Sequence, residues 1–291
     1  MKHLFVAVSA AALMCQVCGP AHATVQMGTD LADFAALSSS GLTNSPTSTI
    51  NGSVGVYPGS SITGFDSSPG VPVTDPQVTS GFVDATTATG SSDNAMLAQA
   101  ELTATIGVLN GLPATALSNP TLGGAGQPSL GPGVYSGATN VTGAFKLQGN
   151  GTPNEQWVFL TNGLVFNVGS GVTIADPGTG ASVFWVDASS VAIDSLVSDP
   201  TTMLGNVLAL TSISMGTDAT DTCGRLLANT GAVTLLSDTI SIGCTGAGLP
   251  TELASSGGLN GGSSPVTNIP EPSSLIIFGG LLLTGLALRR A

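Results

Sequence analysis

The chain has 291 residues, of which 42% are hydrophobic and only 8% are charged, and its formal net charge is −12. This composition is too apolar for an intrinsically disordered chain, and the length fits one large domain or two small ones. The shortage of basic residues excludes a surface for phosphate, so we expect no nucleic-acid partner.

Residues 1–23 have the three parts of a secretory signal peptide. Lys2 gives the basic start, an apolar run covers residues 4–14, and Ala21-His22-Ala23 is a typical cleavage site. His3 and His22, the only histidines of the chain, both belong to this segment. The remainder has no imidazole for a catalytic triad, a general base or a zinc site, so we expect no enzyme, no metal and no cofactor.

The main domain is expected over residues 24–249, and one segment in it has a helical composition. Residues 94–110 are rich in Ala and Leu, with Ser92 or Asp93 as a possible N-cap and Gly111 and Pro113 as the stop. We therefore predict a helix at about 93–110. Its spacing indicates an apolar side made of Met96, Leu97, Ala100, Thr103 and Ile106.

Four later segments repeat one order: an apolar strand, a small polar break and a second strand. They begin at Trp157, Val183, Gly205 and Gly224. A unit of about 20 residues cannot bury its own apolar side, but stacked units can, so the repeat favours a β-solenoid over a β-sandwich. In this alignment three residues of successive repeats occupy equivalent places, namely Phe184, Asn206 and Arg225.

Several side chains of the repeats have simple structural interpretations. Trp157 and Trp185 recur at strand positions and are expected in the core. Cys223 and Cys244 are one coil apart, and in an oxidising compartment they predict a disulfide, with two free thiols as the alternative. Arg225 is expected to pair with a neighbouring Asp. Scattered acids are a weaker candidate for calcium, because they lack the repeat of calcium-binding solenoids: Asp194, Asp199, Asp218 and Asp221.

The C-terminal part begins with a linker rich in Gly, Ser and Pro at 250–269. It continues with Pro270-Glu271-Pro272, an apolar run over 275–288 and then Arg289-Arg290. This order resembles the PEP-CTERM sorting signal, which implies export through the inner membrane, processing by an exosortase, and a secreted or cell-surface protein with a transient C-terminal anchor. The alternative is a short membrane helix held by the two arginines, although the run is shorter than the roughly 20 residues that span a bilayer.

Three blocks of the main domain resemble the microbial ice-binding protein family. The first covers 25–65 and includes Gly28-Thr29 and Thr49-Ile50-Asn51-Gly52; the second covers 130–151, and the third contains the repeats from 157 to 242. The resemblance implies a right-handed, discontinuous β-solenoid of triangular section with a long helix packed alongside. It also implies that the coils of the N-terminal block are completed by the C-terminal part.

The same resemblance implies adsorption to ice through a flat solenoid face that bears Thr and Ser. By place in the repeat, the residues expected on that face are Ser170, Thr173, Ser198, Thr217, Thr220, Ser237 and Thr239. Asp199, Asp218 and Asp238 are expected to interrupt it.

Two other classes of function stay open at this stage. The first is a non-catalytic adhesin or extracellular-matrix protein associated with surface polysaccharide, which an acidic, exported repeat protein would suit. The second is a solenoid enzyme acting on polysaccharide, for which only Lys146 and Arg225 could join the carboxylates.

Overall fold

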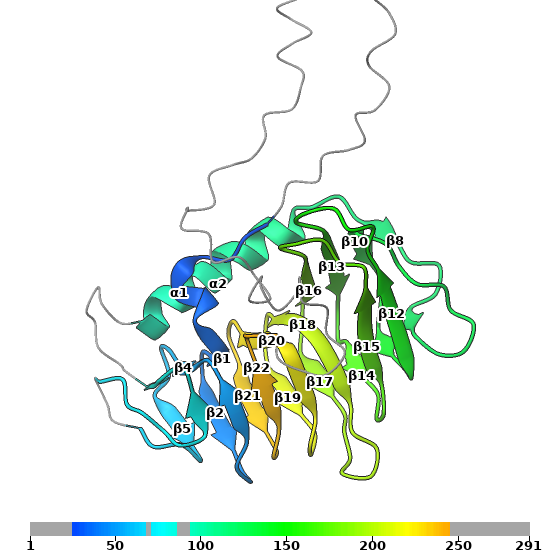
Figure 1. Ribbon diagram of the computed structural model, residues 1–291. Coiled ribbons are helices and arrows are strands. Elements are labelled where there is room, and N and C mark those ends of the chain that lie inside the picture. Colours follow the sequence, from blue (N-terminus) through cyan, green and yellow to red (C-terminus); the bar gives the residue numbers. More distant parts are fainter. Residues whose placement is uncertain (1–24, 68–70, 86–93, 245–291) are drawn as a thin grey trace, which may run out of the picture. The chain divides into compact units, whose positions relative to one another are not determined.

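The computed structural model describes residues 25–67, 71–85 and 94–244 (Figure 1). These residues are mainly β, with parallel strands in a 14-stranded and an 8-stranded sheet, and they include two helices. The predicted signal peptide, linker and sorting segment lie outside the described residues. Within the described ranges, none of the helices has both the length and the apolar character needed to cross a bilayer.

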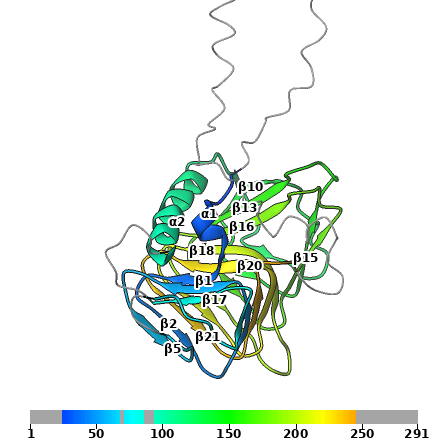
Figure 2. The same cartoon turned by 60° about the vertical axis from the view of Figure 1, so that its left-hand side comes forward.

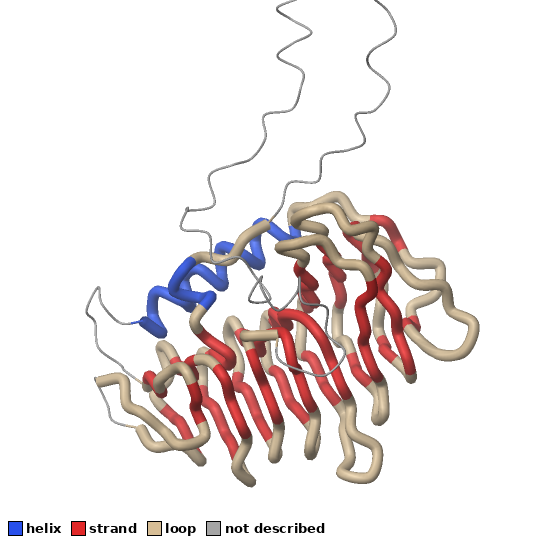
Figure 3. Tube along the Cα trace, viewed as in Figure 1, coloured by secondary structure: helices blue, strands red, loops and turns tan. Residues whose placement is uncertain are grey.

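The strands lie in three rows, which we name walls (Figure 3). The small-residue wall is the whole 8-stranded sheet: β9 (Thr121–Leu122), β11 (Asn140–Val141), β14 (Val165–Phe166), β17 (Val191–Ile193), β19 (Ile213–Met215), β21 (Ala232–Leu235), β2 (Gly41–Asn44) and β5 (Ser61–Thr63).

The 14-stranded sheet supplies the other two walls, because β18 (Thr202–Ala209) and β20 (Thr220–Ala228) take part in both. The threonine wall contains the first residues of these two strands together with β12 (Ala144–Gln148), β15 (Gly171–Ala175), β22 (Thr239–Ser241), β3 (Thr49–Asn51) and β6 (Val78–Thr79). The helix-covered wall contains their later residues together with β8 (Thr115–Ala116), β10 (Gly133–Ser136), β13 (Gln156–Thr161), β16 (Ser182–Asp187), β1 (Phe34–Ser38), β4 (Ser53–Val56) and β7 (Val83–Asp84).

The repeat read from the sequence corresponds to stacked parallel strands. Phe184 pairs with Asn206, and Asn206 pairs with Arg225, so the predicted equivalence of these three residues is confirmed. Parallel pairing between successive repeats also excludes the β-sandwich, whose sheets are built from antiparallel hairpins.

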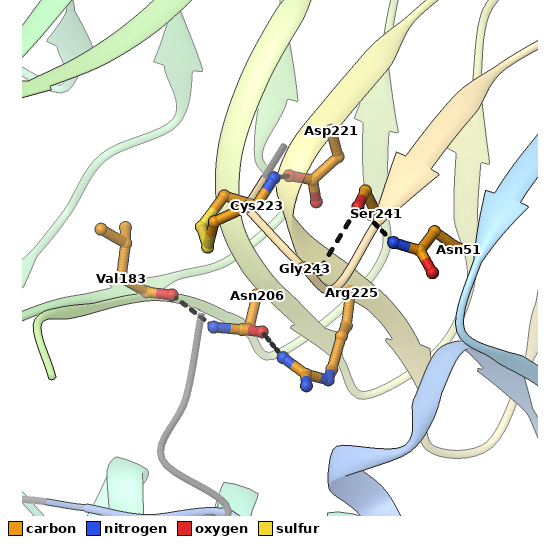
Figure 4. The surroundings of a disulfide bond; sticks show 9 residues. Asn51, Val183, Asn206, Asp221, Cys223, Arg225, Ser241 and Gly243 are labelled. Carbon is orange, nitrogen blue, oxygen red and sulfur yellow. Dashed lines mark hydrogen bonds between the residues drawn. A yellow bond between two sulfur atoms is a disulfide. The ribbon is translucent and has the colours of Figure 1, made fainter. Parts of the chain in front are cut away.

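The N-terminal block completes the stack from the far end of the sequence. Strands β1, β2 and β3 pair with β20, β21 and β22, all in parallel. Arg225 reinforces this junction: its Nε and Nη2 donate hydrogen bonds to the Ala32 carbonyl at 3.1 and 2.6 Å, and its Nη1 donates to Asn206 Oδ1 (Figure 4). Burial lowers the pKa of the guanidinium to about 10, although the charges of the neighbouring Asp221 and Asp33 act in the opposite direction.

Aromatic rings fill the core beside the first repeats. Trp157 and Trp185 are fully buried, as predicted, and each indole N–H donates to a backbone carbonyl, of Leu130 and Leu204 respectively. Phe159 stacks on Trp185 with ring centroids 4.3 Å apart. Both indoles therefore combine a large buried apolar surface with a satisfied polar atom.

The predicted disulfide is present between Cys223 and Cys244. It links β20 to the residues that follow β22, so it fastens the last C-terminal coil beside the point where the N-terminal block joins (Figure 4). Gly205, with φ +110°, lies where β18 turns from one wall to the next, and a Cβ there would lie only 2.7 Å from Val183 Cβ. A side chain at this position would force the two coils apart.

Helix α1 spans Thr29–Ala32, and α2 spans Asn94–Asn110 as predicted. Figure 2 shows α2 beside the helix-covered wall, where it shares an apolar cluster with Phe184, Leu208 and Leu227. The predicted apolar side of α2 is wrong except for Ile106. The buried residues are Ala95, Ala98, Gln99, Leu102, Thr105, Ile106 and Leu109, because apolar and small residues surround the helix and packing, not periodicity, selects the side.

Leu102→Ala should therefore lower the free energy of unfolding by about 2–5 kcal/mol, since it empties a fully buried site between helix and wall. Leu97→Ala is the matched control, because Leu97 is only partly buried. Urea unfolding followed by circular dichroism measures both variants. Equal losses, or a larger loss in Leu97→Ala, would contradict the observed orientation of the helix.

Candidate functional site

Two of the three walls carry outward side chains that the helix does not cover. On the small-residue wall one outward row is formed by residues paired strand to strand from β17 to β5: Ala192, Ser214, Thr234, Thr43 and Thr63. These pairs follow one another without a shift of register. Between them the inward residues of the same strands, such as Ile213, Val233 and Leu42, are buried in the core.

A second row lies two residues earlier on each strand. Ala232, Gly41 and Ser61 are paired in it, and Ser190 and Ser212 directly precede the paired residues Val191 and Ile213. The Ser190 hydroxyl is hydrogen-bonded to Thr211 Oγ1 at 2.6 Å, and Ser212 Oγ accepts the Ala232 N–H at 3.2 Å. Both rows thus consist of small, uncharged side chains, some with fixed hydroxyls, and part of them lines a shallow depression.

The threonine wall has a different outward row. Thr202 pairs with Thr220, Thr220 with Thr239 and Thr239 with Thr49, so four adjacent strands each present a threonine at the same level. Thr220 Oγ1 donates to Thr202 Oγ1 at 3.3 Å. Two residues further along, Asn51 is paired with Ser241 and donates to its hydroxyl at 3.1 Å (Figure 4).

The structure separates the seven residues expected on one face. Thr173, Thr220 and Thr239 lie on strands of the threonine wall and are exposed or partly exposed. The other four lie in the segments that lead from the small-residue wall to the threonine wall: Ser170, Ser198, Thr217 and Ser237. Ser170 is only 1% exposed, so its hydroxyl is removed from any surface.

The expected interruption of the face by Asp238 is wrong. Its side chain is 1% exposed and turns inward, where its two oxygens accept the N–H groups of Ala219 and Leu236 at 3.0 and 2.7 Å. Burial raises the pKa of this carboxyl to about 6. Asp218 lies in the turn before β20 at φ +60°, and Asp199 in the loop before β18, so neither belongs to a strand of the threonine wall.

The acids considered for calcium are not assembled into a site. Asp221 is fully buried beneath the threonine wall, and one of its oxygens accepts the Cys223 N–H at 3.3 Å. Across the described ranges, no group of three or more His, Cys, Asp or Glu side chains could hold a metal ion. Lys146 is exposed on β12, whereas Arg225 is buried at the N-terminal junction, so the two cations do not meet in a cleft.

Sequence reasoning missed Thr202, Thr49 and the whole small-residue wall. Thr202 comes only four residues after Ser198, which was expected on the face, and Thr49 belongs to the N-terminal block, far away in sequence from Thr239. The available signal was the alternation in the second strand of each repeat, as in Ser212-Ile213-Ser214, where small residues flank an apolar one.

Comparisons with known proteins agree with this architecture. The profile of the Ice-binding-like family matches residues 36–241. An ice-binding protein of Nostoc sp. (strain HG1) is 32% identical over 227 residues, which cover 76% of each chain. The chain therefore belongs to the Ice-binding-like family.

Solved structures extend the comparison. An ice-binding protein of the Antarctic ascomycete Antarctomyces psychrotrophicus is 29% identical, with a TM-score of 0.59 over 74% of this chain and 97% of the other. An ice-binding protein of an Arctic yeast, 23% identical, has a TM-score of 0.63 over 75% and 95% of the two chains, which supports the common fold.

The buried Asp221 makes stability depend on pH. Burial raises its pKa from 3.8 to about 8, so the folded protein keeps a proton there that the unfolded chain loses near pH 4. This contribution to stability is complete below about pH 4 and is lost as the pH rises through about 8. From pH 6.5 to 8, above the range of Asp238, the free energy of unfolding should fall by about 2 kcal/mol.

Asp221→Asn removes the titrating group and should flatten this part of the curve. Urea unfolding of both proteins at pH 6.5, 7.2 and 8 measures the slope. The same slope in wild type and Asp221→Asn would show that another group is responsible.

Proposed function

We propose that this protein adsorbs to ice through the small-residue wall. The observation that supports the proposal is the pair of outward rows on β17, β19, β21, β2 and β5, which are in register, uncharged and free of bulky side chains. Because the chain belongs to the Ice-binding-like family, we take ice as the ligand. No catalysis and no cofactor enter this function.

The geometry suits an ordered solid surface. Neighbouring parallel strands lie about 4.8 Å apart, and alternate residues of a strand are about 6.7 Å apart, so the outward groups form a two-dimensional array. Hydroxyls hold water by hydrogen bonds, while the methyl groups of Thr43, Thr63 and Ala192 leave that water free to order over them. Because the strands are already fixed by their neighbours, adsorption costs little conformational entropy.

The wider fold is part of the same proposal. We infer a right-handed β-solenoid of triangular section, discontinuous in sequence, with α2 packed along one wall. Its support is the parallel pairing of every named strand within the three walls and the pairing of β1, β2 and β3 with the C-terminal strands. Such a stack is stiff, and stiffness keeps the outward rows level from coil to coil.

The comparisons give no support to the adhesin or matrix alternative, and polysaccharide remains a partner predicted only from the character of the sequence. Export, a C-terminal anchor and exosortase processing also stay predictions, because the segments concerned lie outside the described residues. The set expected from the sequence, with Thr173, Thr220 and Thr239 on the threonine wall, stays a second candidate surface.

Ser214→Tyr combined with Thr43→Tyr should abolish most of the thermal hysteresis and the inhibition of ice recrystallisation. Both residues are exposed in one outward row, on either side of Thr234, so two phenol rings would hold the wall away from ice. Activity is measured on purified protein in a nanolitre osmometer and in a splat assay.

Ala104→Tyr is the matched control, since Ala104 is exposed on α2, away from the two open walls. It should retain full activity. Unfolding by urea checks that both variants are folded. Wild-type activity in the folded double variant would exclude the small-residue wall, and an inactive wild type would exclude the function.

A further inference from the structure

The described part of the main domain begins and ends at one corner of the stack. Each coil passes from the helix-covered wall to the small-residue wall, then to the threonine wall and back. The corner at which the threonine wall meets the helix-covered wall is therefore the one that does not touch the small-residue wall. We name it the far corner. Gly205 and Gly224 are paired there, where β18 and β20 turn from one wall to the other.

Cys244, the last described residue, lies at the far corner. It follows β22 of the threonine wall, and its sulfur is bonded to Cys223, which directly precedes Gly224 (Figure 4). The next place on the helix-covered wall belongs to β1, which pairs with β20 there. The chain therefore leaves the stack at this point. Residues 245–291, which we name the tail, continue from Cys244.

The N-terminal end is held at the same corner. The side-chain amide of Gln156, the first residue of β13, accepts the Val25 N–H at 2.9 Å and donates to the Val25 carbonyl at 2.7 Å. Val25 and Met27 are buried in the apolar cluster on the helix-covered wall. Since β13, β16, β18 and β20 are successive strands, the two ends lie about 14 Å apart along the stack.

We propose that the far corner is the attachment edge of the domain, and that the protein holds a body bound to its tail on ice through the Cys223–Cys244 disulfide. This inference rests on the proposed function, because it takes the small-residue wall as the surface in contact with ice. A tail that starts at the far corner does not have to pass between that wall and the crystal. The sorting segment predicted at 270–291 would make the cell surface the attached body.

Without the disulfide, load on the tail would act on a very short strand. β22 has three residues, of which Thr239 and Ile240 are paired with β20 and all three are paired with β3. A pull on Cys244 would break these pairs one after another, starting at Ser241. The edge of β3 would then be uncovered, and with it part of the junction between the C-terminal coil and the N-terminal block.

The disulfide transfers this load to β20. That strand spans nine residues and is paired with β18 on one side and with β22 and β1 on the other. Arg225, two residues after Cys223, also joins β20 to the Ala32 carbonyl and to Asn206. A pull at Cys223 must therefore displace a long strand from the middle of the sheet. Because forced unfolding is governed by the unfolding rate, the protein should stay folded under load for longer.

The test uses the full chain with biotin at its C-terminal end, bound to streptavidin beads that settle on ice and are then exposed to flow. Wild-type beads should remain on the ice at a flow that removes bare beads. Cys223→Ser combined with Cys244→Ser should lose most of its beads at that flow. In solution the same double variant should still be taken into growing ice as the wild type is, because the small-residue wall is unchanged.

Attachment at a different site is the matched control. Ala104→Cys places a thiol for biotin on the exposed side of α2, so beads bound there load the stack without using Cys244. These beads should stay on ice equally well with and without the disulfide. Loss of the beads from both attachment sites when the disulfide is removed would indicate a general loss of stability and would contradict the load-bearing disulfide.

Other outcomes separate this inference from the proposed function. Equal retention of the wild type and the double serine variant, both attached at the C-terminal end, would overturn the role of the disulfide. Release of wild-type beads together with bare beads, while soluble wild type is taken into ice, would overturn the attachment edge and leave the proposed function intact. Exclusion of the soluble wild type from ice would overturn both proposals.

Discussion

Each coil is held in register by main-chain hydrogen bonds to its neighbours, and the place of every outward side chain follows from that pairing. Since side chains alternate between the two sides of a strand, a slip of one residue would exchange the core row for the surface row. The core prevents such a slip, because residues such as Ile213, Val233 and Leu42 are paired in one inward row and are all buried. Order at the surface is thus a consequence of packing inside.

Buried carboxylates stabilise the turns at which the chain passes from one wall to the next. Asp187 accepts the backbone N–H groups of Gly163, Leu164 and Ser189 and the hydroxyl of Thr161, all within 3.0 Å. Asp238 likewise accepts two backbone N–H groups, at the turn between β21 and β22. Backbone donors that leave the sheet at a turn are thereby satisfied. Because Asp187 and Asp238 are buried, they add little charge to the two walls that the helix does not cover.

The fold was predictable from the sequence because repetition leaves a direct trace. Phe184, Asn206 and Arg225 could be aligned by eye, and the same three residues are paired in the structure. The extent of α2 was also readable, from its composition and its stop signals. Its buried side was not, because small and apolar residues occur all around it and only contact with Phe184 and Leu208 selects one stripe.

The candidate site was harder to predict, since it depends on which strands become neighbours. Thr49 meets Thr239 only because the N-terminal block is added to the last C-terminal coil, and no local pattern carries that information. The direction of a side chain at a turn is equally hidden: Ser170 and Asp238 look like surface residues in the sequence but are buried. The residue types in the repeats were enough to predict a surface that bears Thr and Ser. Which residues form it depends on pairing between strands that are far apart in the sequence.

The central claim is that the small-residue wall of this stack is ordered and uncharged and adsorbs to ice. The most direct test is partition during slow growth of ice from a dilute solution, with a monomeric protein of similar size and acidity as reference. The account predicts that the wild type is taken into the ice, while the reference stays in the liquid. Exclusion of the folded wild-type protein from the ice to the same extent as the reference would contradict it.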